Sequence, residues 1–433
     1  MNYEETREYL EQLNNRGIKP GLGSITDLCD ALGNPESALR FIHVAGTNGK
    51  GSTSAFIAGI LRASGYRVGV YSSPAVFEER EIISVNGRNI SKENYVNLIG
   101  TIAETGLKFT RFELETALAF LYFKEKECDF VVLECGMGGE LDATNVVKNT
   151  EAAVFTSIGM DHMQYLGDTL EKIAATKGGI IKPGSSVVVS GDNDTVVKET
   201  LCKLADGQGS NVTIADPAMI TKSRFSLSGT AFDYKELKGL KITLLGTNQP
   251  QNAINAIEAV KALEERGFKI KASAYAKGLM STTMSGRFEV ISKKPVFVID
   301  GAHNEPASLV FRDNVSLYFK DKKIIYIICV LKDKEYGKVI NNTVSAAWQV
   351  ITCTSPNRRR GLPGYELAKA VSEVNPNVTA ADSIDEAVEL SLMLADKDTV
   401  IISFGSLSHL SRVKEIVEHK NEIKKDRHGK DDK

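Results

Sequence analysis

Short apolar runs rich in β-branched residues recur along the first half of the chain, and segments with helical periodicity separate them. Five such runs are RFIHVAG, YRVGVYSS, DFVVLECG, AAVFTSIG and SSVVVSG. Between the first two, apolar residues recur at helical spacing from Phe56 to Leu61, and the pattern stops at Gly65. A buried strand, a glycine loop, a helix and a second strand form a βαβ unit. The pattern therefore predicts a mostly parallel α/β sheet with helices on both faces.

The pattern changes over residues 210–247 and again near Gly286. NVTIAD, SRFSLSG and LKITLLG are short alternating segments, so we expect a small antiparallel β addition there. QNAINAIEAVKALEERG then predicts a long helix, and four more strand-like runs follow: PVFVIDGAHN, KKIIYIICVLKD, WQVITCTSPN and DTVIISFGSL. We therefore predict two domains, residues 1–285 and a smaller Rossmann-like α/β domain over residues 286–433.

The two ends of the chain carry different patterns. MNYEETREYLEQL is charged from its fourth residue and has an apolar stripe at helical spacing, which predicts a packed amphipathic helix and not a secretion signal. The charged segment from about residue 420 to 433 predicts a frayed, solvated tail. No apolar run approaches membrane-spanning length, so we expect no membrane partner.

Composition narrows the class of protein. The 433 residues have a formal net charge of −2, which offers no overall field to attract nucleic acid, so any anion site must be local. The six cysteines form no C-x-x-C pair, and several lie within apolar runs. This usage is typical of reduced thiols in a cytoplasmic protein, and we expect the chain to act as a monomer.

The stretch VAGTNGKGST, from Val44 to Thr53, resembles a P-loop with one difference. The usual pattern places the hydroxyl residue directly after the lysine, whereas here Gly51 follows Lys50 and the hydroxyl moves to Ser52. Glycine amides, a helix N-terminus and Lys50 can together bind phosphate. The alternative is a tight turn with an exposed lysine. The strand–loop–helix context favours phosphate, and hence a P-loop NTPase-like first domain.

Two further segments place polar side chains at the end of a predicted strand. Glu134 ends the run DFVVLE, and Asp161 and His162 follow the next run. In open α/β sheets this edge holds the ligand, and a nucleotide site needs a carboxylate there for magnesium. The alternatives are an ordinary strand-end glutamate and a structural histidine. His43, in mid-strand, is expected to be a core residue.

Lys177 lies on the apolar stripe of a predicted helix. The segment DTLEKIAATKGG predicts a capping box from Asp168 to Glu171. Its inward face then contains Leu170, Ile173, Ala174 and Lys177. A buried lysine needs a partner, a shifted pKa or a modification. Carbamylation would convert Lys177 into an anionic metal ligand.

The second domain offers its own polar cluster. VIDGAHN leaves a predicted strand with Asp300 and His303 at its end, and SGRFE supplies Arg287 just before that strand. These residue types suit a nucleotide site near a domain boundary. The alternative is a structural pair of Arg287 and Asp300.

Taken together, these motifs resemble the folylpolyglutamate synthase/dihydrofolate synthase branch of the Mur ligase superfamily. The resemblance runs from about Gly17 to Leu407. The stretches that carry it are HVAGTNGKGS, YSSPAVFEERE, RFELETALAF, LECGMGGELDATN, SIGMDHMQYLGDTLEKIAATKGGIIKPG, NQPQNA, SGRFE, DGAHN and LKDKE.

The resemblance implies ATP and two magnesium ions as cofactors. The implied phosphate and ATP contacts are Gly49, Lys50, Gly51, Ser52, Asn252, Arg287 and Asp300. The implied metal ligands are Ser73, Glu134, His162 and a carbamylated Lys177. Of these, Lys50, His162 and Lys177 are expected to be catalytic, together with His303.

The resemblance also implies substrates and a reaction. The segments expected to bind the folate or pteroate contain Thr110, Arg111, Phe112, Glu113, Leu141, Asp142 and Ala143. His303 and Ser406 lie where the family's second domain approaches L-glutamate. ATP would phosphorylate a substrate carboxylate, and the glutamate amine would displace the phosphate.

Three positions depart from the family's usual pattern. The departures are Ala75, Glu140 and Asn248, of which the first two lie near the expected folate pocket.

Three other functions are less consistent with the sequence. A muramyl-peptide ligase is disfavoured because the glycine loop begins at Gly46, which leaves no room for a nucleotide-sugar domain before it. A non-catalytic ATP-binding regulator would not need Lys177, and a generic P-loop phosphotransferase would not explain DGAHN.

Overall fold

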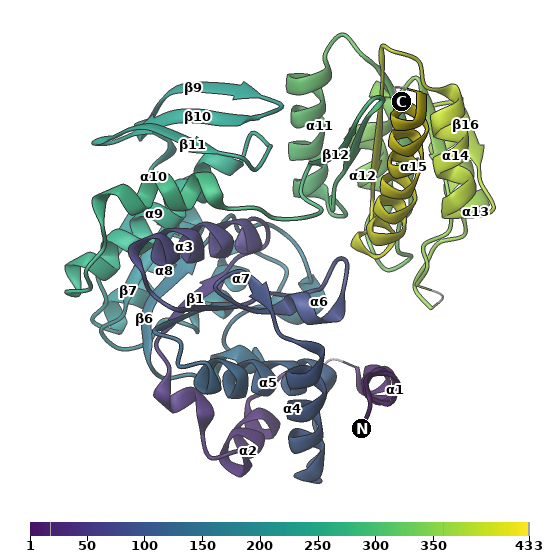
Figure 1. The fold of residues 1–433 in the computed structure, drawn as a ribbon. Helices are drawn as coiled ribbons and strands as arrows, with labels where there is room; N and C mark the ends of the chain where they lie inside the picture. The colour runs from purple at the N-terminus through teal and green to yellow at the C-terminus, as the bar shows by residue number, and fades with distance from the viewer. Residues whose placement is uncertain (18, 358, 432–433) are drawn as a thin grey trace. The chain divides into compact units, whose positions relative to one another are not determined.

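The chain forms two compact units in the computed structural model, which describes residues 1–17, 19–357 and 359–431 (Figure 1). Two short segments before Met284 also belong to the second unit, and from Met284 onward the chain stays in it. The first unit contains Met1–Arg224, Ala231–Thr243 and Gln249–Thr283, and the second contains Phe225–Thr230, Leu244–Asn248 and the residues from Met284 onward.

An eight-stranded sheet forms the centre of the first unit, in the order β4-β3-β2-β5-β1-β6-β7-β8. The six strands from β2 to β8 in this order run parallel, and β3 and β4 add an antiparallel edge. The prediction of a mostly parallel sheet is confirmed. The strands are β1 Phe41–Ala45, β2 Val68–Tyr71, β3 Ile83–Val85, β4 Arg88–Asn89, β5 Phe130–Glu134, β6 Thr150–Phe155, β7 Ser186–Ser190 and β8 Val212–Ala215.

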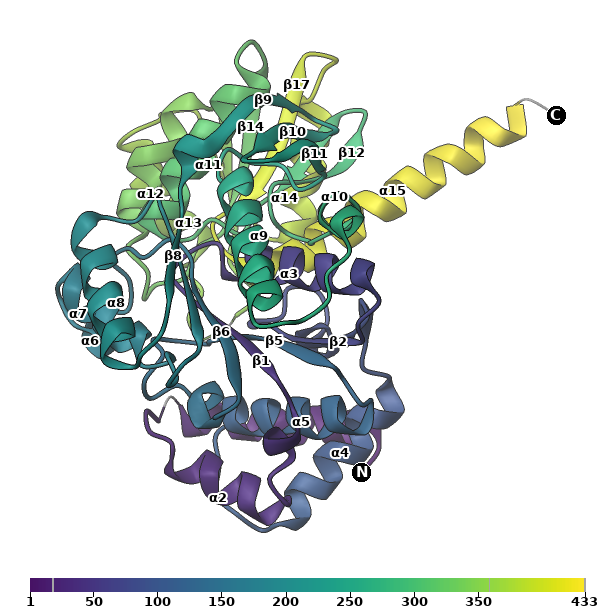
Figure 2. The same cartoon turned by 90° about the vertical axis from the view of Figure 1, so that its left-hand side faces the viewer.

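Helices cover both faces of this sheet, as predicted (Figure 2). On one face, α3 and α9 pack on the sheet and α10 packs on α3; on the other face lie α5, α7 and α8. The opening helix α1 buries Thr6, Leu10 and Leu13. The helices are α1 Tyr3–Leu13, α2 Gly23–Ala31, α3 Lys50–Ser64, α4 Lys92–Glu104, α5 Arg111–Glu125, α6 Met163–Leu166, α7 Leu170–Gly178, α8 Thr195–Gly207, α9 Gln249–Glu265 and α10 Ala272–Ser281.

The expected antiparallel addition exists, but it is shorter than the alternating pattern suggested. It consists of β9 Ile220–Ser226, β10 Gly229–Tyr234 and β11 Leu237–Ile242, joined by two-residue connections. The segment NVTIAD does not belong to it. This segment forms β8, which pairs in parallel with β7 from Val187↔Val212 onward. The reason is that α8 supplies the crossover that returns the chain to the parallel sheet.

The second unit contains a six-stranded sheet in the order β12-β13-β17-β14-β15-β16, in which only the β12–β13 pair is antiparallel. Its core includes the stacked rings of Phe311 and Phe404, whose centroids are 4.2 Å apart. The strands are β12 Glu289–Lys293, β13 Val296–Ile299, β14 Lys323–Ile328, β15 Gln349–Thr352, β16 Val378–Ala380 and β17 Thr399–Phe404, and the helices are α11 Glu305–Phe319, α12 Tyr336–Thr343, α13 Gly364–Ser372, α14 Ile384–Leu394 and α15 Leu410–Asp431.

The charged C-terminal segment differs from the frayed tail that we expected. Its backbone continues α15 as far as Asp431, and residues 432 and 433 lie outside the described part of the chain. Lysine and glutamate have high helix propensity, which accounts for the continuation. Within the described residues, no helix combines the length and the apolar character needed to cross a membrane.

Candidate active site

Four neighbouring parallel strands bring the predicted polar residues of the first unit to one edge of the sheet. The order β2-β5-β1-β6 has the registers Tyr71↔Leu133, Val44↔Glu134 and Ala45↔Phe155. Ser73, Glu134, the glycine loop and the loop that carries His162 therefore follow adjacent strands at their carboxyl ends. Ligands of open α/β sheets bind at this edge, next to the position where the strand order reverses.

The glycine loop connects β1 to α3 through residues 46–49. Gly49 has φ 87°, the left-handed region, and a Cβ at this position would collide with the Asn252 side chain. A Cβ on Gly46 would collide with Thr156. Lys50 is the first residue of α3, so the positive end of that helix faces the loop. The predicted strand–loop–helix arrangement is confirmed.

Two lysines meet at the backbone carbonyl of Gly46. The Nζ atom of Lys50 lies 3.2 Å from this oxygen, and the Nζ atom of Lys177 lies 2.9 Å from it. Lys177 is only 3% exposed, so the prediction that it points inward is confirmed. Burial lowers the pKa of Lys177 from its ordinary value to about 7, and the positive charge of Lys50 lowers it further in the same direction. A neutral amine is thus accessible at physiological pH.

The position of Lys177 is fixed by the loop that follows β5. The backbone N–H of Glu140 donates to Thr176 O at 2.8 Å, and a Cβ on Gly139 would collide with the Lys177 backbone. The Asn145 side-chain amide donates to Glu140 O at 3.0 Å and to Gly179 O at 3.1 Å. The sequence did not predict this role of Asn145, because Gly179 is distant in sequence and Glu140 is brought near only by the turn between them.

The N-terminal cap of α7 lies one residue later than predicted. Thr169 is the cap, and its hydroxyl accepts from the Lys172 N–H at 3.2 Å. The Asp168 carboxylate instead pairs with the Lys172 ammonium at 2.8 Å. Asp168 and Thr169 both have side chains that can cap a helix. Thr169 takes the position, because its hydroxyl accepts from the N–H of Lys172, three residues later.

The predicted metal ligands supply mainly oxygen donors. Glu134 is 6% exposed at the end of β5, and His162 has φ 50° and a side chain that is 41% exposed. No three His, Cys, Asp or Glu side chains in the described ranges are grouped closely enough to hold a metal. A metal here would therefore depend on the Ser73 hydroxyl and on an anionic form of Lys177 besides Glu134. A buried carboxylate, a hydroxyl and a carbamate fit magnesium, which prefers hard oxygen ligands.

The predicted folate-binding segments contain two carboxylates that already have local partners. Glu113 accepts from the Thr110 N–H at 2.6 Å and from the Thr110 hydroxyl at 2.9 Å, in a capping box at the start of α5. Asp142 accepts from Met137 N–H at 2.7 Å and from the Thr144 hydroxyl at 2.6 Å. These contacts organise the loop and the helix end, and they occupy much of the hydrogen-bonding capacity of both side chains.

Other residues of the same segments are more accessible. Leu141 is 51% exposed, and Phe112 is half-buried, with its ring 6.1 Å from that of Tyr71. The Arg111 guanidinium contacts Glu79 at 3.1 Å and Glu115 at 2.7 Å. Leu141, in the loop after β5, and Phe112, in α5, thus offer apolar surface, while Arg111 holds the segment before β3 against α5.

In the second unit, the predicted residues again follow neighbouring strands. β13 and β17 are adjacent, with Ile299↔Ser403, so Asp300, His303 and Ser406 lie at the carboxyl edge. Asp300 accepts from the N–H groups of Phe288 and Ala302, both at 2.8 Å. Burial raises the pKa of the Asp300 carboxyl, whereas the Ala302 amide and the charge of Arg287 lower it. Ser406 is 3% exposed and caps the short helix Leu407–His409.

His43 and the cysteines have the structural character that we expected. His43 is fully buried in β1, and its Nε2 lies 2.9 Å from the Thr144 hydroxyl and 3.1 Å from Cys135 Sγ. Burial lowers the pKa of His43 to about 3, so the ring is neutral. All six cysteines are free thiols.

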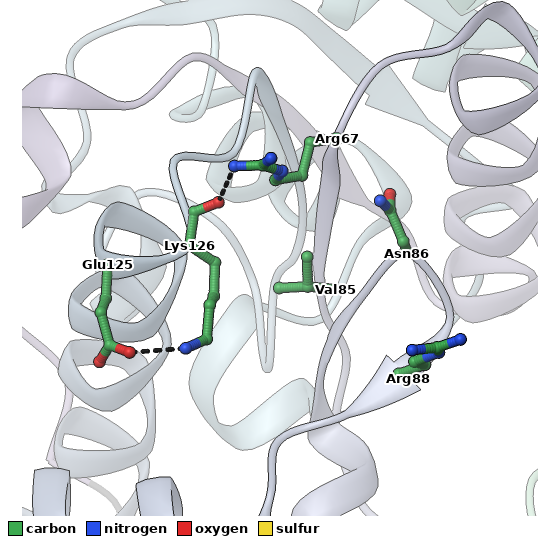
Figure 3. A pocket seen from close by; sticks show the side chains of 6 residues that line it. All are labelled: Arg67, Val85, Asn86, Arg88, Glu125 and Lys126. Carbon is green, nitrogen blue, oxygen red and sulfur yellow. Dashed lines mark hydrogen bonds and ion pairs between the residues drawn. The ribbon is translucent and has the colours of Figure 1, made fainter.

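A surface pocket elsewhere in the first unit contains none of the predicted site residues (Figure 3). Arg67 directly precedes β2, so the pocket lies at the amino end of that strand, opposite Ser73. Two of its cations have carboxylate partners: Arg67 contacts Glu127 at 3.3 Å, and Lys126 contacts Glu125 at 2.6 Å. The lining residues are Arg67, Val85, Asn86, Arg88, Glu125 and Lys126.

Comparison with known proteins gives the same family on both units. Residues 44–260 match the Mur ligase middle domain, and residues 286–407 match the Mur ligase glutamate ligase domain. The chain is 33% identical over 430 residues to the dihydrofolate synthase/folylpolyglutamate synthase of Bacillus subtilis, covering 95% of this chain and 98% of the relative.

Two solved structures show the same fold. Escherichia coli FolC in complex with DHPP and ADP has a TM-score of 0.86 and 27% identity, covering 97% of this chain and 99% of that one. A bifunctional folylpolyglutamate synthase/dihydrofolate synthase with Mn, AMPPNP and L-glutamate bound has a TM-score of 0.83 and 27% identity, covering 96% of this chain and 98% of that one.

We expect Lys177→Met to stabilise the protein in the absence of metal, nucleotide and carbon dioxide. The folded state holds the Lys177 pKa near 7, below its ordinary value, so the charged amine opposes folding. The penalty is complete below pH 7 and fades as pH rises toward the ordinary lysine value. The gain should be about 1–3 kcal/mol at pH 6.5 and should shrink by pH 9.5, as measured by urea unfolding. Lys172→Met, on the exposed face of the same helix, is the control. A Lys177→Met protein less stable than the parent at pH 6.5 would contradict the assignment.

Proposed function

The chain belongs to the folylpolyglutamate synthase/dihydrofolate synthase branch of the Mur ligase family, and we propose that it joins L-glutamate to a folate in an ATP-dependent reaction. The relatives carry these names, and solved relatives bind ADP, DHPP and L-glutamate. The product is a new amide bond, and the intermediate is an acyl phosphate on the folate or pteroate carboxylate. The names of the relatives from Bacillus subtilis and Lacticaseibacillus casei, which cover 95% and 96% of this chain, favour a folate substrate over a muramyl peptide.

The observation that carries this proposal is the buried Lys177 beside Lys50 at the glycine loop. A phosphotransferase with an ordinary P-loop needs one lysine at the phosphates. Here a second lysine, with a pKa of about 7, contacts the same carbonyl as the first. A non-catalytic ATP-binding protein would have no use for a buried amine that destabilises its fold. The pair is suited to a site that becomes functional when the amine is modified and a metal binds.

The proposed ligation uses three reactants: ATP, a substrate with a carboxylate, and L-glutamate. The terminal phosphoryl group of ATP transfers to a substrate carboxylate oxygen, giving ADP and an acyl phosphate. The glutamate amine then attacks the acyl carbon, the amine proton is released, and inorganic phosphate leaves. Lys50 and the amides at the start of α3 stabilise the negative charge on the transferred group. Magnesium, when bound by Ser73, Glu134, His162 and Lys177, would supply further positive charge there.

The lowered pKa of Lys177 supports its carbamylation. A neutral lysine amine adds to carbon dioxide, forming an N–C bond and releasing one proton. With a pKa of about 7, roughly half of the side chain is neutral at pH 7, compared with a very small fraction for an ordinary lysine. The carbamate would replace a positive charge next to Lys50 by a negative one. This exchange relieves the repulsion between the two lysines and creates an anionic oxygen ligand.

The remaining roles rest on position. We assign Asn252, Arg287 and Asp300 to ATP, and His303 and Ser406 to L-glutamate, since the latter two follow adjacent strands at one sheet edge. Leu141 and Phe112 would contact the apolar part of the folate.

A single chain carries the polar sheet edges of both units, which supports a monomer as the working form. The free cysteines support a cytoplasmic location.

Glutamate-dependent phosphate release is the direct test of the activity. We expect release from ATP when L-glutamate is present with either tetrahydrofolate or dihydropteroate, measured in parallel reactions. The name of the Bacillus subtilis relative includes both activities, which favours dihydropteroate as a second substrate. Release that does not require a pterin, or no release with either one, would contradict the proposal.

We also expect Lys177→Ala to abolish turnover, and added bicarbonate not to restore it. Lys172→Ala, on the same helix but exposed, is the matched control and should keep the parental rate. In the parent protein, ¹³C-labelled bicarbonate should give a carbamate carbon resonance that Lys177→Ala lacks and Lys172→Ala retains. Full activity of Lys177→Ala would contradict the carbamate role.

A further inference from the structure

The glycine loop is held from one side by the loop that leaves β6. The N–H groups of Thr47 and Asn48 donate to the carbonyl of Ser157 at 2.8 and 3.2 Å. The Thr47 hydroxyl donates to Gly159 O and accepts from Gly159 N–H, both at 3.0 Å. The Thr156 hydroxyl donates to Asn48 O at 2.8 Å. The direction of the loop's peptide groups therefore depends on where residues 156–159 lie.

Residues 156–159 are in turn held by the side chain of Asn193, which follows β7. Its Nδ2 donates to Thr156 O at 3.0 Å and to Ser190 O at 3.1 Å. Its Oδ1 accepts from the Ile158 N–H at 2.7 Å. Asn193 is 5% exposed, so these bonds form away from solvent. One amide thus joins the end of β7 to two peptide groups of the segment that contacts the glycine loop.

The end of β7 also contacts the helix on the other side of the glycine loop. Gln251, in the first turn of α9, donates to the Ser190 hydroxyl at 2.8 Å. The next residue, Asn252, packs so closely on Gly49 that a Cβ there would force its side-chain amide to move. Ser190 and Asn193 therefore connect the two segments that enclose residues 46–49.

We propose that Asn193 is a positioning residue for phosphate binding, acting through the loop after β6 and not by touching the nucleotide. The proposal rests on the proposed function only in that the glycine loop binds the ATP phosphates. Amide groups must point at phosphate oxygens to bind them, and a small rotation of the peptides removes the interaction. Without the Asn193 side chain, the Thr156 carbonyl and the Ile158 N–H lose this partner, whereas the Ser190 carbonyl still accepts from the Asn193 backbone N–H at 3.3 Å. Residues 156–159 must then move to recover hydrogen bonds.

The second unit contains a matched control. Asn375 is 6% exposed, its Nδ2 donates to Val344 O at 2.8 Å and Ala347 O at 2.9 Å, and its Oδ1 accepts from Asn377 N–H at 3.0 Å. This is the same pattern of bonds and burial as at Asn193. Asn375→Ala should therefore cause a similar loss of stability, while the contacts of the glycine loop are left as they are.

The test is calorimetric titration of the full chain with ATP and with AMP in magnesium buffer, for the parent, Asn193→Ala, Asn193→Asp and Asn375→Ala. Asp at 193 keeps an acceptor for the Ile158 amide but places a second oxygen against two carbonyls. We expect both Asn193 variants to lose about tenfold or more in ATP affinity and clearly less in AMP affinity, since AMP lacks the β- and γ-phosphates. Asn375→Ala should bind both nucleotides as the parent does.

The outcomes separate this proposal from the proposed function. An ATP affinity of Asn193→Ala equal to that of Asn375→Ala would overturn it, as would equal losses for ATP and AMP. Failure of both Asn193 variants to fold, beside a folded Asn375→Ala, would assign Asn193 a purely structural role and also overturn it. A parent that binds ATP but shows no glutamate-dependent turnover would refute the ligase activity and leave the titration result valid.

Discussion

The carbonyl oxygen of Gly46 accepts from two lysines, and the burial of one of them sets the charge of the candidate site. Lys50 approaches from the first turn of α3 and Lys177 from the last turn of α7. Burial is the main reason why charging Lys177 is costly, and repulsion from the Lys50 ammonium group adds to that cost. The chain therefore places a second lysine, with a pKa of about 7, beside the glycine loop, a combination that an ordinary P-loop does not have.

The segments around this carbonyl are joined by neutral amides more than by ions. Asn145 links the loop after β5 to the end of α7, and Asn193 links the ends of β6 and β7. Loops at a sheet edge leave peptide groups that need partners. An aspartate could satisfy the N–H groups, but its negative charge would raise the pKa of Lys177 and repel phosphate. An asparagine provides both donor and acceptor without changing the charge balance.

Local patterns predicted the elements of the fold and the inward position of Lys177, because both depend on spacing within a single segment. The stripe Ile173, Ala174, Lys177 is complete within one helix, and Glu134 directly ends one strand. The features that the sequence did not predict depend on partners that are distant along the chain. Whether residues 212–215 join the parallel sheet depends on the crossover by α8, and the bonds of Asn193 reach Thr156, far away in sequence. No short window of sequence contains such partners, so neither could be inferred from periodicity or capping rules.

The predicted folate-binding residues show a further limit of motif reasoning. A motif gives a set of residues, but it does not show which of them bind other parts of the folded chain and which remain exposed. Glu113 and Asp142 bind amides and hydroxyls of their own segments, while Leu141 presents an exposed apolar side chain. The first two are required so that the loop and the start of α5 have the right shape, and only groups such as Leu141 have surface left for a ligand. Specificity for one folate over another should therefore depend on the exposed positions, among them Glu140, which is exposed and adjoins Leu141.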